Sequence, residues 1–121
     1  PPVFPIFTTL LTLRWLKNLG GVEAIESIND QKAALIYNEI DRNSLFTGHA
    51  DIDSRSTMNA TFKLLDEGHK DAFNEAWASA GISGINGHRS IGGYRASMYN
   101  ALPLESVKVL VDVMNELERT R

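Results

Sequence analysis

One stretch near the C-terminal end of the chain concentrates glycines, arginines and a histidine. It runs from Gly87 to Ser97 with the sequence GHRSIGGYRAS. Its three glycines relieve steric limits on the backbone and allow N–H groups to approach a ligand. Arg89 and Arg95 are six residues apart, and a guanidinium group matches the geometry of a carboxylate or a phosphate. With His88 beside the first arginine, this pair could bind the two ends of a dianionic small molecule.

The same stretch can also be interpreted as a surface loop with turn glycines and solvated arginines. Arginines near glycines are common, so the spacing alone leaves both interpretations open. If a loop leads into a strand here, Arg89 lies in the loop and Arg95 near the start of the strand. A purely structural role for Arg95 would pair it with a carboxylate at the edge of the core, such as Asp66 or Glu67.

Other polar motifs in the chain predict no metal or nucleophilic site. His49 and His69 lie in polar stretches without a second ligand at metal spacing, so we interpret both as solvated surface histidines. The absence of cysteine excludes disulfides, thiolate metal sites and cysteine nucleophiles. No serine lies in a GxSxG motif. Gly81-Ile82-Ser83-Gly84 matches the GxxG of a KH domain, but its flanking residues are not basic.

The composition is typical of one soluble globular domain. The 121 residues are 43% hydrophobic and 22% charged, with a net charge of −3. Because nucleic-acid-binding domains usually carry a basic excess, we expect no nucleic-acid partner. No apolar stretch approaches the roughly 20 residues that span a bilayer, and the first residues lack the features of a signal peptide. We therefore expect residues 1–121 to form a single cytoplasmic domain without a membrane partner.

Hydrophobic periodicity and turn residues predict the elements that must position the arginines. The first predicted helix runs from Ile6 to the stop at Gly20-Gly21, and the second runs from Val22 to Ile40, either without interruption or with a break at Asn29-Asp30. The third runs from near Gly68 to Ala80, and Pro103 begins the last. Trp15 and Trp77 fall on apolar helix faces, where core packing is expected.

Alternation of apolar and polar residues predicts the strands. They are Met58–Lys63, a short strand within Gly81–Gly93 that holds Ile82 and Ile85, and Tyr94–Tyr99. The polar segment around Leu45–Thr47 is predicted as a loop, with a short strand there as the alternative. The resulting order is α-α-β-α-β-β-α. It predicts an α+β domain with a small antiparallel or mixed sheet and helices packed on one face.

The stretch GHRSIGGYRASMYNALPLESV, from Gly87 to Val107, closely resembles the signature region near the C-terminus of phosphoserine aminotransferases. That family carries GHR, a GG two residues on, then RAS, YNA and a proline before its last helix. The opening of the chain is also similar, with Pro1-Pro2, a helix ending in LKNLGG and a helix carrying INDQKA near Asn29–Ala33. The resemblance runs nearly from end to end of the chain.

This resemblance implies the C-terminal small domain of a fold-type-I, class V aminotransferase that depends on pyridoxal 5′-phosphate. Such enzymes transfer an amino group between glutamate and 3-phosphohydroxypyruvate, giving O-phosphoserine and 2-oxoglutarate. By resemblance, Arg95 binds the substrate α-carboxylate, and His88 and Arg89 bind the substrate phosphate. The resemblance further implies a cytoplasmic homodimer in serine biosynthesis, and it leaves a role in vitamin B6 biosynthesis open.

The cofactor-holding residues of the family lie in a larger domain. They are a lysine, an aromatic residue stacked on the pyridine ring and an aspartate paired with the ring nitrogen. This chain has five lysines, none of which lies in a matching motif: Lys17, Lys32, Lys63, Lys70 and Lys108. The family's Asn-Thr segment, which reaches the cofactor phosphate, would lie immediately before Pro1. We therefore expect a fragment with no catalytic residue, no bound cofactor, no metal and no activity alone.

Two functions of other classes remain as alternatives. The first is a free-standing α+β regulatory module that binds a phosphorylated or dicarboxylic metabolite. The second is an RNA-binding domain of KH type, which the acidic net charge disfavours. A longer gene product with a lysine-bearing domain upstream would favour the enzyme.

Overall fold

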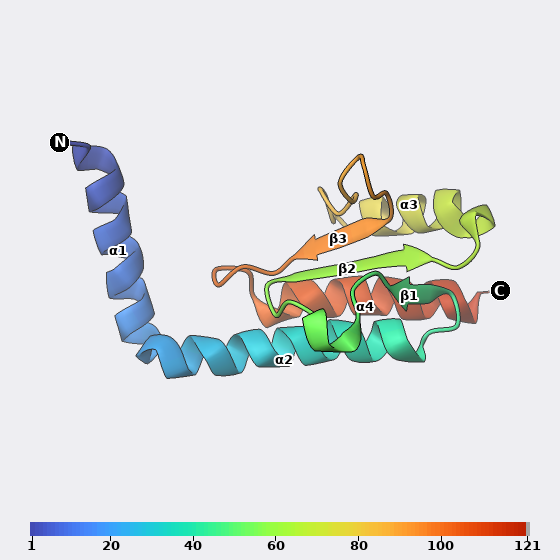
Figure 1. The fold of residues 1–121 in the computed structure, drawn as a ribbon, viewed down its shortest axis with the longest axis horizontal. Helices are drawn as coiled ribbons and strands as arrows, with labels where there is room; N and C mark the ends of the chain where they lie inside the picture. The colour runs from blue at the N-terminus through green and yellow to red at the C-terminus, as the bar shows by residue number, and fades with distance from the viewer. Residues whose placement is uncertain (121) are drawn as a thin grey trace.

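A computed structural model describes residues 1–120 as four α-helices and one three-stranded sheet (Figure 1). The elements in chain order are α1 (Val3–Leu19), α2 (Gly21–Arg42), β1 (Phe46–Gly48), β2 (Asn59–Leu64), α3 (Lys70–Ser79), β3 (Tyr94–Ser97) and α4 (Leu104–Arg119), with 3₁₀ turns at Ile52–Ser54 and Glu67–His69. The second helix runs without a break through Asn29-Asp30.

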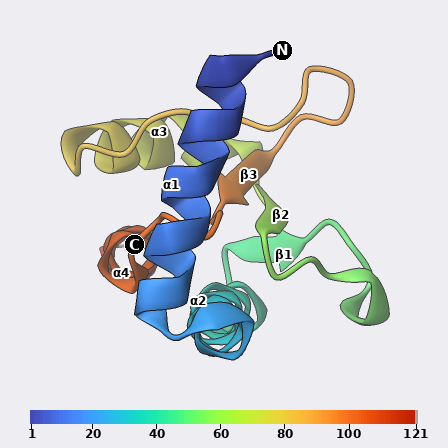
Figure 2. The ribbon, with the colours of Figure 1, turned by 90° about the vertical axis from the view of Figure 1, so that its left-hand side faces the viewer.

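The sheet is antiparallel throughout, with β2 in its centre. Phe46 of β1 lies opposite Leu64, and Thr61 of β2 lies opposite Arg95 of β3. Successive residues of a strand point to opposite faces, and the buried residues of the strands share one face. The helices α2, α3 and α4 lie on that face (Figures 1 and 2). This confirms the predicted α+β class with helices on one side of a small sheet.

Two short strands differ from the prediction. The strand weighed at Leu45–Thr47 forms at Phe46–Gly48, whereas the segment Gly81–Gly93 forms only an isolated bridge from Asn86 to Tyr94. Four glycines of that segment have positive φ, which turns the backbone repeatedly and prevents an extended run: Gly81, Gly84, Gly92 and Gly93. The expected order is thus observed with one strand more before α3 and one fewer after it.

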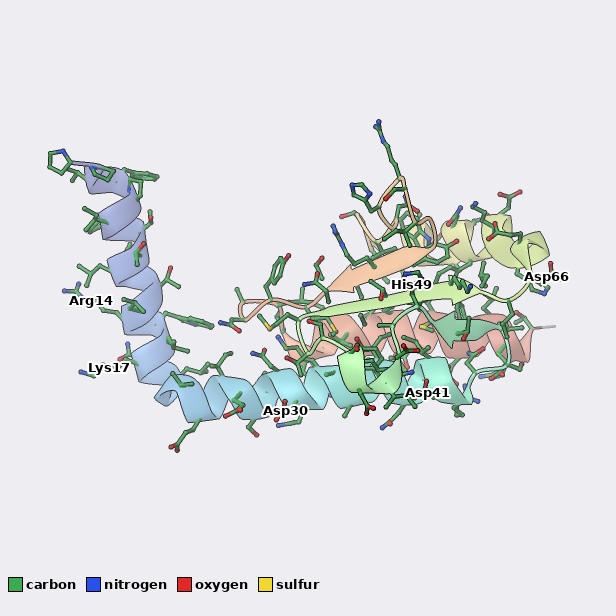
Figure 3. All side chains as sticks on the ribbon, in the orientation of Figure 1. Arg14, Lys17, Asp30, Asp41, His49 and Asp66 are labelled. Atoms are coloured by element: carbon green, nitrogen blue, oxygen red, sulfur yellow. The ribbon has the colours of Figure 1, made fainter. Side chains whose placement is uncertain are left out.

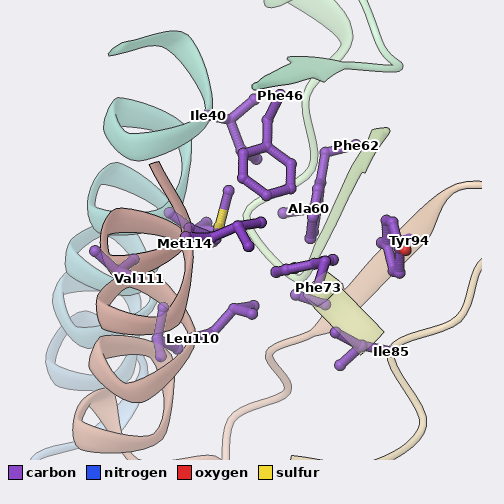
Figure 4. Packing of buried hydrophobic residues seen from close by; sticks show 14 of the residues in the cluster. Ile40, Phe46, Ala60, Phe62, Phe73, Ile85, Tyr94, Leu110, Val111 and Met114 are labelled. Carbon is purple, nitrogen blue, oxygen red and sulfur yellow. The ribbon is translucent and has the colours of Figure 1, made fainter. Parts of the chain in front are cut away.

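The core lies between the sheet and the helices (Figure 4). Its centre is an aromatic cluster in which ring centroids lie 4.8–6.4 Å apart: Phe46, Phe62, Phe73 and Tyr94. The predicted apolar face of the last helix is buried against them: Val107, Leu110, Val111, Met114 and Leu117. Trp77 packs at the edge of this core, as expected.

Helix α1 stands apart from the rest of the domain (Figures 1 and 2). It has no buried residue, and Trp15 is 41% exposed, contrary to the expected core position. The reason is the direction of α1. The chain turns at Gly20 and Gly21, which both have positive φ, so α1 points away from the sheet. Within residues 1–120, no helix combines the length and the apolar character that crossing a bilayer requires.

Candidate functional site

The face of the sheet opposite the helices carries polar side chains. We call it the open face and define it by the residues that alternate with the buried ones: Thr47, Asn59, Thr61, Lys63, Arg95 and Ser97. No helix of residues 1–120 covers it (Figure 2). Across the open face, Ser97 Oγ donates a hydrogen bond of 3.1 Å to Asn59 Oδ1. Side chains on this face therefore remain available to a ligand.

The glycine-rich loop Gly87–Gly93 closes one end of the open face. The N–H of Gly87 donates to the carbonyl of Gly93 at 2.9 Å, and the N–H groups of Ile91 and Gly92 donate to the carbonyl of His88 at 3.0 and 2.8 Å. A Cβ at Gly93 would lie 2.7 Å from the carbonyl oxygen of Phe62. Glycine thus allows the loop to lie directly against β2, which an ordinary side chain would prevent.

A cavity of about 250 Å³ lies between this loop and the open face. Its lining is His49, Thr61, Phe62, Lys63, Gly87, His88, Ile91, Gly92, Gly93, Tyr94 and Arg95. Every ionisable side chain in this set except the Tyr94 phenol is basic, and no aspartate or glutamate is among them. Basic groups lining one concave surface raise the local concentration of anions. The cavity is therefore suited to an anionic ligand.

The structure brings together two of the three residues predicted to bind substrate. His88 and Arg95 line the cavity, one from the loop and the other from β3. Arg89, the third, is exposed in the same loop and lies outside the cavity lining. The predicted division between the two arginines is observed, since Arg89 lies in the loop and Arg95 lies near the start of β3.

Sequence reasoning missed His49 and Lys63, which also line the cavity. The alternation in Met58–Lys63 could have placed Lys63 on the polar face of its strand. For His49 the sequence held no such signal, because its position depends on pairing between strands. Its N–H donates to the carbonyl of Thr61 at 3.0 Å, which extends the β1–β2 ladder past the end of β1.

The ring of His88 is oriented by its own loop. The backbone N–H of Ser90 donates to Nδ1 at 3.3 Å, and Ser90 Oγ lies 2.8 Å from the same nitrogen. With Nδ1 as the acceptor of the backbone N–H, a neutral ring carries its proton on Nε2. His88 can therefore donate a hydrogen bond through Nε2 to an anion.

Arg95 is exposed and forms no ion pair within residues 1–120. The carboxylates weighed as structural partners are engaged elsewhere: Asp66 accepts from the N–H of Gly68 at 2.8 Å, and Glu67 pairs with Lys70 at 3.1 Å. The backbone N–H of Arg95 donates to the carbonyl of Ile85 at 2.7 Å. The strand is thus held in place while the guanidinium group remains available.

A separate charge network lies outside the cavity lining. Arg42 bridges Glu39 at 2.8 Å and Glu118 at 2.9 Å. The backbone N–H of Ser44 donates to Glu118 at 2.7 Å, and this bond, followed by that from the Ser44 hydroxyl and by Arg42, lowers the pKa of Glu118. Because these groups satisfy one another and link α2 to α4, we interpret the network as structural.

The residues of the cavity match pyridoxal phosphate poorly. They include one lysine, Lys63, and no carboxylate that could pair with a pyridine nitrogen. The ring of Tyr94 stacks on Phe62 in the core, with centroids 5.5 Å apart, and presents no free face. The described residues therefore fit the anionic groups of a substrate and do not by themselves fit the cofactor. Within residues 1–120, no group of three or more histidines and carboxylates is arranged to hold a metal.

The chain is similar to curated proteins over nearly its whole length, although no protein-family model matches it. A phosphoserine aminotransferase of Flavobacterium psychrophilum is 68% identical over 118 residues, covering 98% of this chain and 33% of that protein. A phosphoserine aminotransferase of Porphyromonas gingivalis is 52% identical over 121 residues, with coverages of 98% and 33%.

Solved structures agree. A phosphoserine aminotransferase from Bacillus circulans subsp. alkalophilus is similar with a TM-score of 0.93 at 43% identity, over 100% of this chain and 34% of that one. The enzyme from Trichomonas vaginalis, solved with pyridoxal phosphate bound, gives a TM-score of 0.86 at 33% identity, with coverages of 95% and 33%. The chain spans about a third of the length of these relatives. In sequence and in fold, the chain is similar to the C-terminal third of phosphoserine aminotransferases.

Proposed function

We propose that this chain is the substrate-binding small domain of a pyridoxal-phosphate-dependent aminotransferase acting on glutamate and 3-phosphohydroxypyruvate. The observation that supports this most strongly is the cavity on the open face, lined by His49, Lys63, His88 and Arg95 and by no carboxylate. Each substrate carries two anionic groups, which are two carboxylates in glutamate and a carboxylate and a phosphate in 3-phosphohydroxypyruvate. A cavity of this sign attracts them and disfavours cationic amines.

In this proposal Arg95 holds the α-carboxylate, the one group that the two substrates share. A guanidinium group can bind a carboxylate through two parallel hydrogen bonds, which fixes direction as well as distance. His88, with Nε2 as donor, and Arg89 bind the phosphate of 3-phosphohydroxypyruvate. Because Arg89 lies outside the cavity lining, its contact with a bound phosphate requires a change in its side-chain position.

The cofactor supplies an electrophilic group and an electron sink for the transfer of the amino group. The part of this chain is to bind the substrate and to orient it by its α-carboxylate. A fixed orientation lowers the entropic cost of the reaction, because the reacting groups no longer have to find each other.

We further propose that residues 1–121 are one domain of a longer cytoplasmic polypeptide whose remaining part carries the cofactor lysine. The parent would act in serine biosynthesis as a homodimer. The apolar surface of α1 supports this, because exposed apolar patches of this kind mark contact sites. Nine large hydrophobic residues of this helix are exposed: Val3, Phe4, Ile6, Phe7, Leu10, Leu11, Leu13, Trp15 and Leu19. The similarity to complete aminotransferases favours this over a free-standing regulatory module.

The direct test is an assay of the full-length protein with glutamate and 3-phosphohydroxypyruvate. We expect O-phosphoserine and 2-oxoglutarate in equal amounts, and no product from residues 1–121 alone. A full-length protein that transfers no amino group would contradict the proposal. Tight binding of a phosphorylated metabolite by residues 1–121 alone, with no activity in the longer protein, would favour the regulatory module.

A further inference from the structure

The side chain of Lys32, in the middle of α2, is completely buried. Its ammonium group donates three hydrogen bonds to backbone carbonyls: to Met98 at 3.1 Å, Tyr99 at 3.0 Å and Leu102 at 3.1 Å. An ammonium has three N–H donors, so its donor capacity is used in full. Within residues 1–120, Lys32 has no carboxylate at ion-pair distance.

All three carbonyls belong to the connection between β3 and α4. Asn29, one helical turn before Lys32, holds the same connection through a hydrogen bond of 2.9 Å from Nδ2 to Asn100 Oδ1. Figure 1 shows this connection beside α2. The INDQKA and YNA segments, some seventy residues apart in the sequence, therefore meet in the fold.

A buried cation without a counter-ion is costly to retain, because it loses its hydration. The same burial lowers the pKa of Lys32. Methionine would fill a similar volume without this cost, but it would leave three carbonyls without a donor. Lys32 therefore fixes the positions of these three carbonyls at a cost in the free energy of folding.

The peptide groups around Met98 link this connection to Arg95. The carbonyl of Met98 accepts from Lys32, and its N–H donates to the carbonyl of Met58 at 2.7 Å. Met98, which lies three residues after Arg95, is thus held both by α2 and by the segment that leads into β2. A one-residue slip of β3 against β2 would turn Arg95 from the open face toward the core.

We propose that Lys32 is a positioning residue for Arg95: by holding the carbonyls of residues 98, 99 and 102, it fixes the register of β3 and thus the guanidinium group on the open face. This inference rests on the proposed function, in which Arg95 binds the substrate carboxylate. Lys32 itself touches no substrate.

The test uses the full-length enzyme and the variant Lys32→Met. Because a displacement of about 1 Å in a positioning group can cost about a hundredfold, we expect kcat/KM to fall by up to about a hundredfold for glutamate and 3-phosphohydroxypyruvate alike. In an Arg95→Ala background the same substitution should lower kcat/KM less than about threefold further, because the group that it positions is gone. Independent, multiplying effects of the two substitutions would overturn the inference.

Leu117→Ala is the matched control, because it removes buried contacts at the far end of α4. It should lower the melting temperature without changing kcat/KM. Lys32→Arg, which keeps the charge and donors, should recover part of the activity. Should Lys32→Met fail to fold, Asn29→Ala, which loses only the bond to Asn100, should show the same pattern with a smaller loss.

Hydrogen exchange of the Arg95 and Met98 amides needs no substrate and tests the positioning by itself. Both amides should exchange faster in Lys32→Met than in Leu117→Ala. Unchanged exchange would overturn the inference. If exchange accelerates but Arg95→Ala leaves the kinetics unchanged, Lys32 still fixes β3, and it is the proposed role of Arg95 that fails.

Discussion

Arg95 lies directly opposite Thr61 in the register of β3 and β2, on the sheet face that no helix of residues 1–120 covers. Its neighbours along β3, Tyr94 and Ala96, point the other way and are buried. The strand therefore serves two purposes with one alternating pattern, since alternate residues build the core and present a cation to the solvent. Binding chemistry can vary on one face without disturbing the packing on the other.

Arg95→Ala in the full-length enzyme should impair both half-reactions while leaving stability near normal. Because Arg95 is exposed and lacks an ion pair in the described chain, its removal disturbs no packing. Loss of a desolvated charge pair with substrate costs about 2–5 kcal/mol, which is roughly thirty- to several-thousand-fold in kcat/KM. Melting and both half-reactions should be measured on one preparation. A lower melting temperature with unchanged kinetics would show a structural role instead.

His88→Ala should weaken 3-phosphohydroxypyruvate much more than glutamate, because only the former carries a phosphate. One charge-assisted hydrogen bond is worth about 1.5–3 kcal/mol, or roughly ten- to a hundred-fold in affinity. Arg89→Ala should change the same ratio in the same direction. The ratio of kcat/KM values for the two substrates is the measurement, and equal losses for both substrates would assign these residues to folding of the loop.

Gly87→Ala should open the glycine loop. A Cβ at Gly87 would collide with the carbonyl oxygen of Gly92, and relief of this contact would break the bond from Gly87 N–H to the Gly93 carbonyl. The matched control is Gly81→Ala, where φ is +77° but no atom lies within 4 Å of the added Cβ. The control should cost about 1–2 kcal/mol of stability from its backbone conformation alone. Substrate affinity should fall for Gly87→Ala and remain unchanged for Gly81→Ala; similar affinities would contradict the proposed site.

Glu118→Gln should destabilise the protein in a pH-dependent way. Hydrogen bonds from Ser44 and Arg42 lower the pKa of Glu118 below its ordinary value of 4.5, so its contribution is present above that value. As the pH falls through the lowered pKa, the carboxylate is protonated in the native state and the contribution is lost. The difference in melting temperature between the two proteins should therefore be largest near neutral pH and shrink in acid. The control is Glu105→Gln, because Glu105 is exposed and, among the described residues, pairs with Lys108 alone; it should show little difference at any pH.

The helices were largely predictable because their signals are local. The stripe from Val107 to Leu117 follows the helical repeat, and Pro103 and the Gly20-Gly21 pair mark helix boundaries that the structure reproduces. The structure of the glycine-rich segment Gly81–Gly93 was harder to predict, because the spacing of the apolar residues Ile82 and Ile85 is typical of a strand. Its backbone is instead decided by positive φ at the surrounding glycines, which the hydrophobic pattern does not report.

The site was predictable only as far as it lies within one segment. His88 and Arg95 are close in sequence, so the stretch GHRSIGGYRAS predicted them as parts of one candidate site. Lys63 and His49 reach the same cavity through strand pairing, which brings together residues from β2, the end of β1 and the loop before β3. The burial of Lys32 was equally hidden, because its three acceptors lie more than sixty residues away.

A small change of direction at the junction of α1 and α2 is amplified along the length of α1. Helix α1 has 17 residues and is about 25 Å long, and Gly20 alone separates it from Gly21, the first residue of α2. A rotation of about 10° at these two glycines would move Pro1 by roughly 4 Å. Glycine resists such rotation weakly, although a Cβ at Gly20 would lie 2.9 Å from that of Ala24. Small torsional changes at two residues can thus produce large displacements at the N-terminus, while the sheet and its cavity stay still.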